Sequence, residues 1–143
     1  MDRQLIEKKI EAYANKLLKK TDYKINFVIV SKTKPDLDDI RIFMIESFLC
    51  PEFVVKSREK TVAFYRQIFA TFASIIGYKD EEIAKFLDKD RTTIIHCRRC
   101  ILNYLEIKDP VTTDSFNLLY NKIAETYGKN IFGTNPFKRY YPE

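Results

Sequence analysis

Residues 83–105 constrain the fold of this chain more than any other stretch, because a short polar break separates two apolar-periodic segments there. The first segment ends just before the polar pair at residues 88–89. A second helix then begins at Asp90, whose side-chain oxygen we expect to accept a hydrogen bond from the backbone N–H of Thr92 or Thr93. This order of features predicts a helix-turn-helix.

The residues that follow the expected cap can contact DNA. In a helix-turn-helix the second helix enters the major groove with its N-terminus first, so these side chains reach the base edges. Arg91 can donate two parallel hydrogen bonds to guanine, while Thr92 and Thr93 each offer a hydroxyl group and a methyl group. The helix N-terminus also attracts phosphate. The pattern therefore predicts binding to double-stranded DNA.

The charge distribution favours the same partner. Among 143 residues there are 25 Lys and Arg against 20 Asp and Glu, which gives a formal net charge of +5. Between Lys56 and Arg99 the chain has ten basic and six acidic side chains, so most of the excess lies on this segment. A moderate basic excess also occurs in proteins without a polyanionic partner, and charge alone therefore does not decide the question.

Three motifs in this region resemble one family, the C-terminal duplex-binding domain of the bacterial replication initiator DnaA. The family reads Asp-His-Thr-Thr-Val-Leu-His-Ala where residues 90–97 read Asp-Arg-Thr-Thr-Ile-Ile-His-Cys. Its basic Ser-Arg loop and Arg-Gln helix are similar to residues 56–58 and 66–67. Its Gly-Leu-Ser-x-x-Glu-Ile-Gly turn is similar to residues 77–84, and the whole match covers about residues 37 to 107.

The resemblance implies an all-α helical bundle with a Trp-repressor-like helix-turn-helix. It implies that Arg91, Thr92 and Thr93 read the major groove behind the Asp90 cap, and that Arg58 reaches the minor groove. The other implied contacts go to phosphates, which set register rather than sequence preference. They come from Lys56, Arg66, Gln67, Lys89, His96 and Arg99. Arg66 and Gln67 are expected on the side of their helix that faces away from the core.

One residue departs from the family pattern in a way that bears on sequence preference. Arg91 stands where the family has His. Because Arg is well suited to the two acceptors of guanine, we expect a guanine preference at the base it contacts. The fold implied by the resemblance does not depend on this residue, whereas the DNA sequence read by the family does not carry over to this chain.

The N-terminal residues predict a helix and a segment of uncertain type. Residues 2–20 place an apolar face on one side of a helix, formed by Leu5, Ile6, Ile10, Tyr13, Leu17 and Leu18. Two readings stay open: the helix packs on its own domain, which is favoured, or it pairs with a second copy to make a homodimer. Residues 22–31 have strand character but no partner strand. They either pair across a dimer or form an extended or helical segment on the core, and the second reading is preferred.

Further helices are expected on both sides of the central motif. One is capped by Asp38 or Asp39 and runs through Cys50, with Leu49 at the edge of its apolar face. Residues 61–76 and 80–87 form the next two helices, with a stop at residue 77, a glycine.

The C-terminal part predicts one more helix and an irregular tail. The helix begins at Thr113 or Asp114 and ends at Tyr127 before a glycine. Residues 129–143 lack periodicity, which predicts a tail that packs loosely or stays mobile. The expected organisation is therefore an N-terminal segment at 1–36, a DNA-binding domain at 37–108, and a C-terminal helix and tail at 109–143.

Several kinds of chemistry have no motif in the sequence. No phosphate-binding Gly-x4-Gly-Lys-Ser/Thr loop is present, so we expect neither ATP binding of that type nor any other cofactor. Cys97, Cys100 and His96 are too few for a zinc site, and no nucleophile is marked for catalysis, so no metal and no enzyme activity are expected. Three cysteines and no apolar run of membrane-spanning length favour a cytoplasmic protein that does not enter a membrane.

The sequence therefore predicts a sequence-specific DNA-binding protein in replication initiation or its control. The alternative is a helical module that reuses the same fold, either as a transcription regulator or to bind partners such as replication proteins. Salt-dependent affinity for DNA separates the protein-interaction module from the DNA-binding roles, because an interaction module has none.

Overall fold

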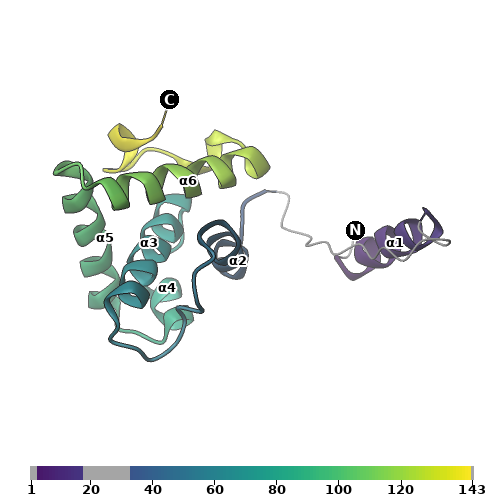
Figure 1. The fold of residues 1–143 in the computed structure, drawn as a ribbon, viewed down its shortest axis with the longest axis horizontal. Helices are drawn as coiled ribbons and strands as arrows, with labels where there is room; N and C mark the ends of the chain where they lie inside the picture. The colour runs from purple at the N-terminus through teal and green to yellow at the C-terminus, as the bar shows by residue number, and fades with distance from the viewer. Residues whose placement is uncertain (1–2, 18–32, 143) are drawn as a thin grey trace. The chain divides into compact units, whose positions relative to one another are not determined.

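The computed structural model describes residues 3–17 and 33–142. The chain divides into two compact units, residues 1–31 and 32–143, which are considered separately. Within the described residues every regular element is helical, with six α-helices and two short 3-10 helices (Figure 1). The prediction of an all-α protein is confirmed. The segment at residues 22–31, for which strand and other readings were open, lies outside the described residues.

The first unit contributes one helix to this description, α1 (Arg3–Leu17). Its predicted apolar face includes Leu5, Ile10 and Tyr13, whose side chains are 45%, 39% and 66% exposed. A homodimer through this helix stays a prediction. None of the helices in the described ranges has both the length and the apolar character needed to cross a lipid bilayer.

In the second unit, α2 (Leu37–Phe48) begins at a different cap from the one predicted. Asp36 is the N-cap: its carboxylate accepts from the backbone N–H of Asp39 at 2.7 Å, and the Asp39 carboxylate accepts from the backbone N–H of Asp36 at 3.1 Å. This reciprocal pair satisfies two N–H groups at the helix start. The helix also ends earlier than predicted, because Leu49 takes a left-handed conformation and is 90% exposed instead of joining the apolar face.

The core is built around α3 (Lys60–Ile76), which packs against α2, α4 and α5. Ile68, Phe69 and Phe72 are fully buried along it. Figure 1 shows α3 inside the bundle, with α6 lying across its end. Gly77 ends the helix with a φ of 117°, and its N–H bonds the carbonyls of Ala73 and Ser74, as predicted for a glycine stop.

A turn of three residues joins α4 (Asp80–Leu87) to α5 (Arg91–Glu106). Asp88 takes a left-handed conformation, and the N–H of Lys89 bonds the carbonyl of Ala84 at 2.9 Å, which closes the end of α4. Asp90 is the N-cap of α5, but its side chain makes no cap hydrogen bond. Instead its backbone carbonyl accepts from the N–H of Thr93 at 3.0 Å. The predicted side-chain cap is therefore wrong, although the predicted start of the helix is correct.

α5 packs on the core through one apolar stripe, as expected of the second apolar-periodic segment of residues 83–105. The stripe, all of it buried, consists of Ile94, Cys97, Ile101 and Leu105. Beside this stripe, a half-buried ion pair between Arg98 and Asp80 ties α5 to the start of α4. Since the partners lie on two helices, this pair fixes the N-terminal part of α4 against α5.

The last helix, α6 (Pro110–Tyr127), starts earlier than predicted. Asp109 is its N-cap and accepts hydrogen bonds from the backbone N–H and the hydroxyl of Thr112, at 3.0 and 2.7 Å. These two bonds hold the pKa of the Asp109 carboxyl below its ordinary value. Pro110 takes the first helical position, where a missing N–H has no cost. The pair Asp109-Pro110 thus opens α6, and a cap at Thr113 or Asp114 was the wrong prediction.

The C-terminal tail packs on the core, in contrast to the prediction. It forms η1 (Lys129–Phe132) and η2 (Lys138–Tyr140), and Phe132 and Phe137 are 0% and 4% exposed. The ring of Phe132 stacks on Tyr120 with centroids 4.2 Å apart. The tail is held on the core by these buried rings although its sequence has no helical periodicity, because aromatic side chains bury large apolar areas.

The packing of the tail predicts a large loss of stability for Phe132→Ala. Removing a fully buried ring leaves a cavity, and we expect the free energy of unfolding to fall by about 3–5 kcal/mol. Urea unfolding followed by circular dichroism measures the change. Val111→Ala is the control, since Val111 is 66% exposed and its truncation should change stability by less than about 0.5 kcal/mol. Equal effects of the two substitutions would contradict the packing of the tail.

Candidate nucleic-acid interface

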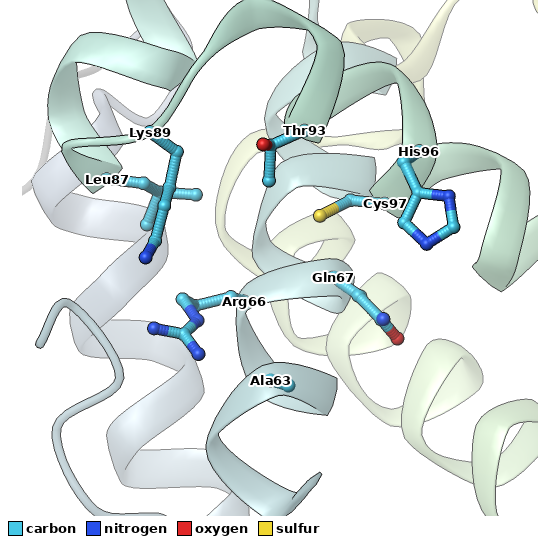
Figure 2. A pocket seen from close by; sticks show the side chains of 8 residues that line it. All are labelled: Ala63, Arg66, Gln67, Leu87, Lys89, Thr93, His96 and Cys97. Atoms are coloured by element: carbon cyan, nitrogen blue, oxygen red, sulfur yellow. The ribbon is translucent and has the colours of Figure 1, made fainter. Parts of the chain in front are cut away.

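A pocket of about 260 Å³ opens where α3, the turn after α4, and α5 meet (Figure 2). Its lining comes from three separate parts of the sequence: Ala63, Arg66 and Gln67 from α3; Leu87 and Lys89 from the end of α4 and the turn; and Thr93, His96 and Cys97 from α5. Five of these residues were predicted from sequence to contact DNA. The fold therefore brings Arg66, Gln67, Lys89, Thr93 and His96 to one place.

The pocket has a positive character. Arg66 and Lys89 are cations, and Gln67, Thr93 and His96 supply an amide, a hydroxyl and an imidazole. Among its lining residues none is acidic. In Figure 2 the side chain of Lys89 extends from the turn over the side of the pocket where Arg66 lies. Charge and donor groups of this kind suit an anion such as a backbone phosphate.

Arg66 is not placed as predicted. It is 8% exposed, although the sequence predicted it on the side of α3 away from the core. Its Nη1 donates to the carbonyl of Val55 at 2.7 Å, and its Nη2 donates to the carbonyl of Ser57. A buried guanidinium must find acceptors for its N–H groups, and here the backbone of the loop between α2 and α3 supplies them.

The same loop carries the two basic side chains that were predicted to reach DNA. Lys56 and Arg58 are exposed and alternate with Val55 and Ser57, whose carbonyls Arg66 binds. The hydroxyl of Ser57 also accepts from the backbone N–H of Glu59 at 3.2 Å. The loop is therefore attached to α3 by its backbone while its cations face solvent.

At the start of α5, Arg91 and Thr92 are exposed and Thr93 is half-buried. The Arg91 Nε lies 3.5 Å from a carboxylate oxygen of Glu81, and both side chains are more than 60% exposed. Sequence reasoning missed this pair, because ten residues separate its partners and no local spacing reveals the contact. His96 and Arg99 are also exposed, as predicted, but Arg99 lies outside the pocket.

The acidic run at the start of α4 is mostly engaged within the protein. Asp80 forms the ion pair with Arg98, and the Glu82 carboxylate accepts from the backbone N–H of Lys79 at 3.1 Å. Glu81 is the member of the run that faces Arg91. Two of the three carboxylates, Asp80 and Glu81, are therefore paired with cations of α5, while Glu82 keeps its negative charge.

The cysteines near the pocket differ in environment. Cys97 is buried, and burial raises the pKa of its thiol from 9.0 to about 11. Cys100 is half-buried, and its Sγ lies 3.4 Å from Nε2 of His96. Among the residues that the structure describes, no three His, Cys, Asp or Glu side chains gather as metal ligands. Cys97 is thus a core residue whose stabilisation of the fold is complete below pH 9 and is lost as the pH rises toward 11.

Comparisons with protein-family models, with curated proteins and with solved structures found no match to this chain.

The environments of the two thiols predict different rates of alkylation. Cys97 is buried and the pKa of its thiol is raised, so at pH 8 iodoacetamide should modify Cys100 well before Cys97 in the folded protein. Trypsin cleaves after Arg98 and Arg99, which places the two cysteines on different peptides for mass spectrometry. Unfolding in urea should abolish the difference. Equal labelling of the two in the native protein would show that Cys97 is accessible.

Proposed function

We propose that this chain is a sequence-specific double-stranded DNA-binding protein in which α4 and α5 form a helix-turn-helix. The proposed fold is that of the DnaA duplex-binding domain, with Trp-repressor-like geometry. One observation carries the proposal: side chains from three sequence segments, each expected to contact DNA, line one pocket that has two cations and no acidic lining residue. A site that binds successive phosphates of a DNA backbone requires basic and polar side chains brought together in this way.

In the proposed complex, the N-terminal turn of α5 lies in the major groove. Arg91 and Thr92 are exposed there and can reach base edges. Arg91 exchanges its contact with Glu81 for guanine. The exchange is favourable because an exposed ion pair contributes about 0.2–1 kcal/mol, whereas a bidentate contact to guanine is worth about 1–3 kcal/mol.

The phosphates on either side of the groove are bound by the pocket and the loop. Lys89, Gln67 and His96 line the opening where α5 meets α3. The loop between α2 and α3 presents Lys56 and Arg58 to solvent, with Arg58 proposed for the minor groove. These contacts supply most of the affinity and its salt dependence, while α5 supplies the sequence preference.

The biological role that fits a DnaA-like module is replication initiation or its control, and transcription regulation is a second role for the same DNA-binding site. A protein-interaction function is the alternative class. It is favoured by a second pocket of about 540 Å³, which Phe64, Tyr104 and Val111 line with partly exposed apolar side chains. Such a surface could bind a replication protein.

Fluorescence anisotropy with random duplexes and duplexes containing the DnaA box tests the proposal at several salt concentrations. We expect affinity to fall steeply with salt. Lys89→Ala should weaken binding to all sequences and lower the magnitude of the salt slope by about 1. Lys122→Ala, an exposed substitution on α6 outside the pocket, is the matched control and should change neither quantity appreciably. If the wild type binds DNA at low salt no more tightly than with a millimolar dissociation constant, the interaction module would be favoured.

Selection of binding sites from random duplexes tests the role of Arg91. Wild-type protein should enrich guanine at one position, and Arg91→His should relax that position by about 1–3 kcal/mol of discrimination while leaving the others unchanged. Lys89→Ala, selected in parallel, should retain the guanine. Enriched sites without guanine at any fixed position would contradict base reading by Arg91.

A further inference from the structure

Arg66 connects two parts of the candidate interface without facing solvent itself. Arg66 is 8% exposed, and its guanidinium donates to the carbonyls of Val55 and Ser57 in the loop. The residues beside these carbonyls are Lys56 and Arg58, which are exposed. A single side chain from the middle of α3 therefore sets the backbone of the segment that presents both cations.

We propose that Arg66 is a positioning residue, which orders the basic loop before DNA arrives and acts on affinity through Arg58 and Lys56. The proposal rests on the proposed function. It replaces the direct phosphate contact that the sequence implied for Arg66, because the residue is only 8% exposed and both terminal nitrogens of its guanidinium donate to protein carbonyls. Ordering the loop in advance lowers the conformational entropy that binding would otherwise lose.

The geometry requires a guanidinium rather than a positive charge alone. The two acceptors belong to alternate residues of the loop, and two separate nitrogens reach them. Arginine presents its donors as a rigid fork, whereas the lysine ammonium is a compact group on a flexible stem. Arg66→Lys therefore keeps the charge near the pocket and loses the attachment of the loop.

The free protein provides the first test, without DNA. Trypsin can cleave the loop after Lys56 and Arg58, and both sites remain in Arg66→Lys. We expect cleavage at these two sites to be about tenfold faster in the variant, the factor that corresponds to one lost charge-assisted hydrogen bond. Arg139→Lys, in an exposed pair with Glu106, is the control and should leave the rate unchanged. Equal rates for Arg66→Lys and wild type would overturn the ordering role.

A double-mutant cycle provides the second test. Arg66→Lys and Arg58→Ala should each weaken binding by about tenfold. In Arg66→Lys the basic side chains of the loop must be immobilised when DNA binds, and in Arg58→Ala one of these side chains is removed. If Arg66 acts through Arg58 and Lys56, adding Arg66→Lys to the Lys56→Ala/Arg58→Ala variant should weaken binding no further. Independent, multiplying losses would instead indicate a direct contact of Arg66 with DNA and would overturn the proposal.

A third test uses NMR on the wild-type protein, so its result does not depend on whether the variants fold. The proposal predicts that the guanidinium NMR signals of Arg66 keep their chemical shifts when DNA is added, while those of Arg58 move. Large shifts at Arg66 would show that it leaves the loop to bind phosphate. A wild type that binds no DNA would defeat the proposed function, and the trypsin rates would still decide whether Arg66 orders the loop.

Discussion

Burial of α3 on several sides is the constraint from which the arrangement of the second unit follows. Its fully buried side chains include Ile68, Phe69 and Phe72, and α2, α4 and α5 cover it from different directions. A helix that is apolar around most of its surface is stable only when other elements enclose it. Two of the covering helices, α4 and α5, meet at the turn that joins them, where Arg66 and Gln67 of α3 line the pocket.

The candidate site lies at this junction. Gln67 immediately precedes the fully buried Ile68, while Thr93 and His96 flank the buried Ile94 and Cys97 on α5. Their positions beside the pocket are therefore consequences of core packing on the adjacent positions. Binding residues on rigid helices are placed more precisely than residues on loops that lack such support. The loop between α2 and α3 is instead attached to α3 by its hydrogen bonds to Arg66.

The features that local periodicity determines were predictable from sequence. The buried stripe of α5, the extent of α4 and the glycine at the end of α3 follow from spacing and from the conformational freedom of glycine. Arg66 was not predictable, because its acceptors lie 9 and 11 residues away on irregular backbone. The N-cap of α2 was not predictable either, because whether Asp36 or an acidic neighbour caps the helix depends on where the preceding chain turns. The DNA contacts themselves stay predictions.

The aromatic rings of α6 and of the tail connect late residues to early ones. Phe132 lies against Phe72, with ring centroids 6.4 Å apart, and Phe137 stacks near Phe116. Phe72 therefore lacks part of its packing until Phe132 has been synthesised. Because domains generally fold as units, we expect the helices that carry the candidate interface to reach their final packing only after the tail has left the ribosome. The residues of α5 are thus synthesised well before the packing of this helix is complete.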